Sequence, residues 1–268
     1  MIALPPSQNA ARVERLGHFM LKGVNKALRE HAMLANGDRV LVAVSGGKDS
    51  LTLLDLLYRR QRFAPEDYCL VVGHLRSDHH CGHAVPEEWL RAWCEARGVP
   101  LVTAAMEVAD EIAAAAREGS VGPCFLCARR RRRALVELAR AQSCTKIALG
   151  HHADDLAETA LLNLFFNARL ETMAPVMPLF AGLVTLIRPL AYIEERDIVT
   201  FVRAAGFPIT GAPCPDGAAS RRATVRRLLR AIESEHHGAK RCILSAVAHA
   251  SHRTAATTHP KEDDRVEY

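Results

Sequence analysis

Hydrophobic and polar positions along the chain fall into two alternating patterns. Long amphipathic stretches have the spacing of helices, and short apolar or β-branched runs lie between them. Five of these short runs predict strands, near residues 39–44, 69–74, 100–104, 145–149 and 184–187. Alternation of this kind predicts an α/β protein with a doubly wound parallel sheet and helices on both faces.

The two ends of the chain differ from this body. Residues 10–31 have apolar positions near the helical period and stop before an Asn-Gly-Asp turn, which predicts an N-terminal helical extension over 1–36. Residues 37–210 then form the expected catalytic domain. Residues 211–268 form a C-terminal segment with an arginine-rich helix and a polar tail.

Composition narrows the class of protein. Of 268 residues, 49% are hydrophobic and 5% aromatic, which is ordinary for a folded enzyme. No apolar run approaches the roughly 18 residues of a membrane span, and the opening segment lacks the apolar core of a secretory signal. We therefore expect a cytoplasmic protein that does not enter membranes, and its eight cysteines are expected to be thiols, metal ligands or catalysts.

Positive charge is clustered more than the net charge of +5 suggests. Arg129, Arg130, Arg131, Arg132 and Arg133 form an unbroken run, and five more arginines recur between positions 221 and 230. Clustered arginine suits a phosphate-rich partner such as RNA. A solvated helix face is the alternative explanation.

A strand, a glycine loop and a helix follow one another in the pattern of a phosphate site. The loop is Ser45-Gly46-Gly47-Lys48-Asp49-Ser50. Its glycines let backbone N–H groups approach phosphate oxygens at a helix N-terminus. The serine hydroxyls can donate hydrogen bonds, Lys48 supplies positive charge, and Asp49 can help to hold Mg²⁺. A tight turn with a serine cap would explain the glycines but not the other residues together.

A second polar element follows the strand near 145–149. It contains Gly150, His151, Asp154 and Asp155 and opens another helix. Because the carboxyl ends of parallel strands meet at one edge of a sheet, this element is expected beside the first loop, near nucleotide and magnesium. Acidic residues that only stabilise a helix N-terminus are the alternative.

Three cysteines stand in proline and glycine contexts. Cys124 and Cys127 have the C-x-x-C spacing that suits a metal centre, and Cys214 lies in a separate loop. The pair alone fits a redox couple, half a zinc site, two cluster ligands or two ordinary thiols. A closed zinc site lacks an evident fourth cysteine, although a histidine could serve, whereas a cluster on three cysteines leaves one iron open.

These motifs together resemble the tRNA 2-thiocytidine synthetase family of PP-loop ATPases. The SGGKDS loop, the PCxxC followed by arginines, the GHHxDD element, the Ile187–Tyr192 stretch and the late Pro-Cys occur in that family's order over roughly residues 10–232. The resemblance implies an adenine nucleotide alpha hydrolase-like PP-loop fold, ATP with Mg²⁺, a [4Fe-4S] cluster on Cys124, Cys127 and Cys214, and cytidine 32 of tRNA as the substrate.

The chemistry implied is adenylation of the C2 oxygen of that cytidine, followed by its replacement with sulfur. Lys48, Asp49, Asp154 and Asp155 are the expected catalytic residues, and the run of arginines at 129–133 is expected to hold tRNA. A sulfur donor such as a cysteine desulfurase is an expected partner, and a homodimer is one option for assembly. Alternatives are a thiolase of another tRNA base or of a small molecule, and a non-catalytic, cluster-bearing module for RNA binding or redox sensing.

Some residues depart from the family or stay outside these motifs. Asn167-Ala168 stands where the family commonly has two glycines. The histidine-rich loop from His79 to His83 is interpreted as a polar surface loop rather than a metal site. Cysteines in apolar patterns are expected to be buried thiols, namely Cys69, Cys94, Cys144 and Cys242.

Overall fold

The fold, seen in a computed structural model, is built on a six-stranded sheet with the order β3-β2-β1-β4-β6-β5. The structure describes residues 10–79, 84–118, 122–211 and 220–257. The strands are β1 (Asp38–Ala43), β2 (Tyr68–Ser77), β3 (Leu101–Met106), β4 (Lys146–Ala148), β5 (Val176–Leu179) and β6 (Val184–Ile187). All five strands predicted from the hydrophobic pattern are present, and the doubly wound α/β class is confirmed.

Strand β5 is the one that the pattern missed. It lies at the edge of the sheet, pairs antiparallel with β6, and contains Pro178. Proline has no N–H to donate to a ladder, so it is confined to positions such as an edge strand and masks the usual strand signal. All other paired strands of the sheet run parallel.

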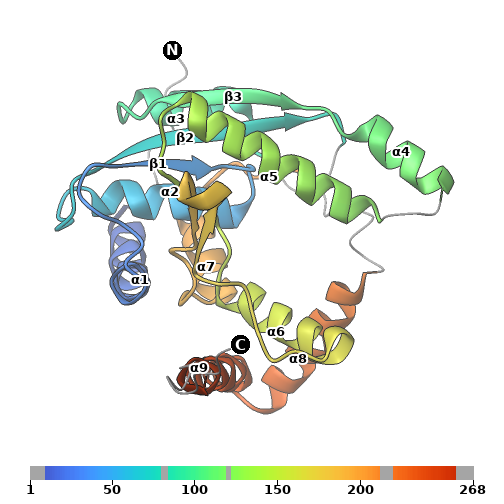
Figure 1. The fold of residues 1–268 in the computed structure, drawn as a ribbon. Coiled ribbons are helices and arrows are strands. Elements are labelled where there is room, and N and C mark those ends of the chain that lie inside the picture. Colours follow the sequence, from blue (N-terminus) through green and yellow to red (C-terminus); the bar gives the residue numbers. More distant parts are fainter. Residues whose placement is uncertain (1–9, 80–83, 119–121, 212–219, 258–268) are drawn as a thin grey trace, which may run out of the picture. The chain divides into compact units, whose positions relative to one another are not determined.

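Helices cover both faces of the sheet (Figure 1). Apolar residues of α1, α2, α3 and α7 form one core with alternate residues of β1 and β2, whereas α5 packs on the opposite face against Leu41, Val71 and Ile147. The helices are α1 (Ala10–Glu30), α2 (Lys48–Arg60), α3 (Glu87–Glu95), α4 (Ala109–Glu118), α5 (Pro123–Ala141), α6 (Ala153–Asn167), α7 (Glu195–Ala205), α8 (Arg221–Glu235) and α9 (Ala239–Thr257), with a short 3-10 helix at Phe180–Gly182. The predicted N-terminal helix is confirmed.

The chain divides into two compact units. The larger contains residues 1–153 and 174–220, and the smaller contains residues 154–173 and 221–268. In the smaller unit, Val225 and Leu229 of α8 pack on Ala157 and Leu161 of α6. The buried Glu158 carboxylate accepts two hydrogen bonds from Arg226 nearby. The division into 1–36, 37–210 and 211–268 stays a prediction.

Two expectations from the sequence are wrong in detail. Strand β2 extends to Ser77, so residues 75–77 are strand and not loop. Cys69 and Cys242 are exposed, whereas Cys94 and Cys144 are buried as expected. Among the helices described, none is both long and apolar enough to cross a membrane.

A candidate nucleotide site and a cysteine pair

The glycine loop after β1 has a backbone that only glycine accommodates. Gly46 has a φ of +89°, and a Cβ at this position would lie 2.5 Å from the backbone nitrogen of Val85. Both conditions exclude a larger residue. Gly47 is extended and is the N-cap of α2, with no side-chain cap. The loop therefore turns tightly and leads straight into a helix N-terminus, as the sequence predicted.

The two serines of the loop brace its backbone. The Ser45 N–H donates to the Ser50 hydroxyl over 3.2 Å, and that hydroxyl donates to the Gly47 carbonyl over 2.9 Å. The two hydroxyl oxygens are 3.3 Å apart. Ser50 is buried. Its contacts hold the backbone of the loop in one shape.

Lys48 is held between two carboxylates. Its Nζ lies 2.9 Å from Asp49 Oδ1 and 3.0 Å from Glu195 Oε1. Burial opposes the charge of Lys48, but Asp49 and Glu195 outweigh it, so the pKa of this ammonium is raised above its ordinary value. Glu195, in the first turn of α7, is a site residue that the sequence did not identify.

The element after β4 meets the glycine loop as predicted. A Cβ on Gly150 would lie 3.0 Å from both the Asp49 carbonyl carbon and the Ser50 nitrogen, so the two backbones approach each other closely. The buried His152 places its Nε2 3.5 Å from Asp49 Oδ1. His151 is the neighbouring residue in the same loop. One patch of polar groups is thus formed by two segments about a hundred residues apart.

Asp154 and Asp155 belong to the smaller unit and are engaged within it. Lys240 donates to the Asp154 carboxylate, which is buried, and Arg222 Nη1 lies 3.8 Å from Asp155 Oδ1. Both acids occupy the first turn of α6, where negative charge also stabilises the helix. Their catalytic role stays a prediction.

The cysteine pair occupies the first turn of α5. Gly122 is the N-cap and Pro123 follows it, so Cys124 and Cys127 are one helical turn apart on the same side. Cys124 is exposed and Cys127 is buried. Cys127 packs against Met106 and Val108. One thiol therefore faces solvent while the other is anchored in an apolar environment.

Cationic groups lie close to the buried thiol. Arg131 Nη2 is 3.5 Å from Cys127 Sγ. This guanidinium donates a hydrogen bond to the sulfur, so a polar contact accompanies the apolar neighbours of the buried thiol. The third predicted ligand, Cys214, and residues 80–83 of the histidine-rich loop lie outside the described residues. Within the described ranges, no group of three or more His, Cys, Asp or Glu residues is placed to hold a metal ion.

The arginine run lies on α5, and acidic neighbours occupy part of it. Arg129 and Arg130 both pair with Glu111, and Arg133 pairs with Glu137 over 2.8 Å. Arg129, Arg130 and Arg133 line a surface pocket. The arginine run thus has two features. Part of it is a solvated helix face with ion pairs, which was the alternative explanation, and part of it lines a basic surface pocket.

The comparisons with known proteins agree with this arrangement. Residues 20–232 match the model of the PP-loop domain family. The tRNA-cytidine(32) 2-sulfurtransferase of Geobacter metallireducens is 40% identical over 233 residues, which cover 86% of this chain and 89% of the relative. The chain belongs to the tRNA-cytidine(32) 2-sulfurtransferase family of PP-loop proteins. A second member, from an Anaeromyxobacter species, is 38% identical over 89% of this chain and 81% of the relative.

A solved structure supports the fold of this family member. The U34-tRNA thiolase NcsA from Methanococcus maripaludis, described with its [4Fe-4S] cluster, superposes with a TM-score of 0.72 at 22% identity. The match covers 88% of this chain and 80% of the thiolase. At this identity, the comparison establishes the shared fold.

The Ile187–Tyr192 stretch, part of the resemblance to this family, contains a buried cation. Arg188 follows β6 directly, and one of its guanidinium nitrogens donates to the Ala174 carbonyl. Its Nε has no hydrogen-bond partner among the described residues. Burial and then Arg132 lower the pKa of Arg188. Only the fold reveals this environment, because the sequence does not show which arginines become buried.

Proposed function

We propose that the protein adenylates the C2 oxygen of a cytidine, at position 32 of tRNA, with ATP and replaces that oxygen with sulfur. The single observation that carries the proposal is the contact between two loops: Gly150 and His152 lie against Asp49, directly beside Ser50. In a PP-loop protein these segments bracket the space for nucleotide phosphates. The relatives at 38–40% identity supply the choice of tRNA and of the base.

Activation is the task of the glycine loop. The C2 oxygen of a pyrimidine is a poor leaving group by itself. Once it is adenylated, it departs as part of AMP, which is a stable leaving group. The hydroxyls of the glycine loop, Ser45 to Ser50, and the backbone N–H groups at the N-terminus of α2 are assigned to the phosphates, with Gly150 and His151 beside them. Lys48 stabilises negative charge that develops there, which requires it to leave Asp49 or Glu195 in part.

Carboxylates are assigned to the magnesium ion that accompanies ATP. Asp49 is the first candidate, because it lies in the loop and already faces Lys48 and His152. Asp154 and Asp155 are the further candidates, and each must exchange its present basic partner for the ion.

The cysteines fit a cluster on the evidence of their own chemistry. Cys124 and Cys127 lie one turn apart at a helix start, with the Arg131 guanidinium 3.5 Å from Cys127 Sγ, and Cys214 is the proposed third ligand. When bound through three thiolates, such a cluster supplies an iron with an open position that can carry sulfur. Cys127, held by its apolar neighbours, fixes the position of the pair.

Partners follow from the reaction. We assign Arg129, Arg130, Arg131, Arg132 and Arg133 to the phosphates of tRNA, whose single-stranded anticodon loop can present a base without duplex opening. A sulfur donor such as a cysteine desulfurase is required to renew the sulfur. The cytoplasm, where such donors and tRNA meet, is the proposed location, and a homodimer is the proposed assembly.

Mass spectrometry of tRNA nucleosides tests the function. Cells that lack the gene should contain no 2-thiocytidine at position 32, and the intact gene should restore it. A gene carrying Lys48→Ala should not restore it. A loss of thiolation at another base, with position 32 unchanged, would instead favour a thiolase of that other base.

A further inference from the structure

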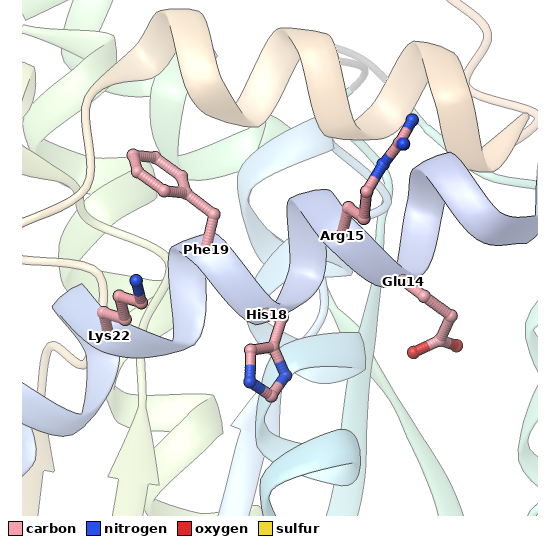
Figure 2. Close-up of a pocket in the computed structure, with 5 residues that line it drawn as sticks. All are labelled: Glu14, Arg15, His18, Phe19 and Lys22. Atoms are coloured by element: carbon pink, nitrogen blue, oxygen red, sulfur yellow. The ribbon is translucent and has the colours of Figure 1, made fainter.

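Helix α1 has a basic face that the chemistry above does not use. Every third or fourth residue along one side is a cation, with one aromatic residue among them. These residues, which we call the α1 stripe, are Arg12, Arg15, Phe19, Lys22, Lys26 and Arg29, and all six are exposed. Their spacing places them within about 100° of arc and along about 25 Å of helix. Figure 2 shows Arg15, Phe19 and Lys22 projecting from one side of α1 and His18 and Glu14 from the other.

Within the larger unit, the described residues leave this stripe exposed. The opposite side of α1 packs into the core through residues such as Met20, Val24 and Leu28. Arg12, Arg15, Lys22 and Arg29 form no ion pair with any described residue. Lys26 forms a 3.9 Å ion pair with Glu30, and Glu30 in turn accepts a hydrogen bond from Tyr192. The positive charge of the stripe is therefore largely uncompensated.

Phe19 supports a specific kind of partner. Its helical spacing places it on the side of α1 away from the core, 59% of it is exposed, and it lies one turn from both Arg15 and Lys22 in the pocket of Figure 2. A cationic row interrupted by an exposed aromatic ring suits nucleic acid, since cations hold phosphates and a ring can stack on an unpaired base. A membrane surface would be met by several apolar residues, and this face offers one.

The stripe leads toward the candidate nucleotide site. Lys26 lies 5.0 Å from the centre of the Tyr192 ring, and the next residue, Ile193, accepts a hydrogen bond from Ala153. Ala153 follows His152, which faces Asp49. Glu195, two residues after Ile193, contacts Lys48. One end of the stripe is thus connected through a few residues to the groups that would handle ATP.

We propose that the α1 stripe is a docking surface for the phosphate backbone of tRNA, with Phe19 stacking on an unpaired base or packing against a sugar. This inference rests on the proposed function for the identity of the RNA. The stripe would hold the body of the substrate while the arginines of α5 act close to the cysteines. It adds a second, separate set of phosphate contacts to the run at 129–133.

The test compares two double variants of the full-length protein that each remove two exposed positive charges. Arg15→Gln with Lys22→Gln changes the stripe, and Arg62→Gln with Arg91→Gln changes cations elsewhere on the same unit. Binding of an unmodified tRNA transcript is measured over a range of salt concentrations. The stripe variant should lose about 1.4 to 1.8 from the slope of log affinity against log salt, and the control variant should keep the wild-type slope.

Two further measurements separate charge from stacking. Phe19→Ala should weaken tRNA binding by about fivefold or more without changing the salt slope, and Phe19→Trp should restore affinity. In turnover, the loss in the stripe variant should appear in the KM for tRNA, with kcat retained. Circular dichroism should show unchanged folding, because these side chains lie on the surface.

The outcomes distinguish this inference from the proposed function. Equal salt slopes for the stripe and control variants would overturn the docking surface. So would a stripe variant that binds tRNA normally but loses self-association, because the face would then lie between two copies of the chain. A wild-type protein that binds tRNA through the stripe but releases no pyrophosphate would refute the enzyme proposal and leave the surface standing.

Discussion

The glycine loop and the cysteine pair both stand at the start of a helix, yet their surroundings differ. Gly47 and Gly122 are both extended N-caps without a side-chain cap, so each helix leaves its first N–H groups to other partners. Around the loop, a Cβ on Gly46 would strike Val85, whereas a Cβ on Gly122 would meet nothing within 4 Å. Among the described residues, the backbone of the glycine loop is thus closely packed at Gly46, whereas Gly122 has no such contact.

This contrast indicates two ways of preparing a site. Phosphate recognition depends on several backbone groups at fixed positions, so tight packing and internal hydrogen bonds serve it. A metal centre draws its geometry from its ligands, so the protein must supply thiols within reach and can leave the rest to binding. We therefore expect changes to the cysteines to abolish cluster binding. Changes to the loop should reduce the reaction rate or ATP binding to different degrees.

The largest expected effect is at the cysteines. Cys124→Ala and Cys127→Ala should each remove iron from anaerobically purified protein and reduce thiolation to background, because two thiolates cannot hold a cluster. Iron and sulfide assays together with the visible absorption of the protein measure this. Exposed Cys69 is the control, and Cys69→Ala should retain full iron. One bound zinc with no iron, in a protein that still thiolates tRNA, would disprove the cluster.

Lys48→Ala should have the next largest effect. Loss of the cation should cost about 2.7 to 4 kcal/mol of transition-state stabilisation, or about 100- to 1000-fold in the rate of pyrophosphate release. The iron content should not change, which separates the two sites. Lys48→Arg is the matched variant and should recover part of the rate through its charge. A rate within twofold of wild type for Lys48→Ala would contradict the role of the loop.

Gly46→Ala tests the close packing of the loop. The backbone of an alanine would be strained at a φ of +89°, and its methyl group would collide with Val85. Both effects together should cost about 2 to 4 kcal/mol of folding stability or displace the loop and weaken ATP binding. Gly98 is the control, because its φ is +64° but nothing lies within 4 Å of its Cβ position. Thermal unfolding and ATP titration of both variants check the difference.

The smallest expected effect is at Glu195, and it depends on pH. Glu195→Gln removes one of the two carboxylates that raise the pKa of Lys48, so that pKa should fall. Because the proposed reaction needs the charged lysine, the variant should lose activity at a lower alkaline pH than wild type. At neutral pH the rate should change by about fivefold at most, as for other partly exposed ion pairs. Coincident alkaline limbs in the pH profiles would contradict this contact.

The sequence alone determined much of the fold and the position of the nucleotide loop. Five strands, the N-terminal helix and the glycine loop are visible because hydrophobic period and glycine chemistry act locally, within a few residues. The expectation that the segment at Gly150 would lie beside this loop rested on one general rule about parallel sheets. For these features, local pattern and overall fold agree.

Only the tertiary structure decided which charges are paired, buried or open. Glu195 reaches Lys48 across the sequence, Glu111 neutralises part of the arginine run, and Arg188 becomes buried after β6. Ion pairing and burial depend on residues brought together from distant positions, and the period of one helix cannot specify what another helix places against it.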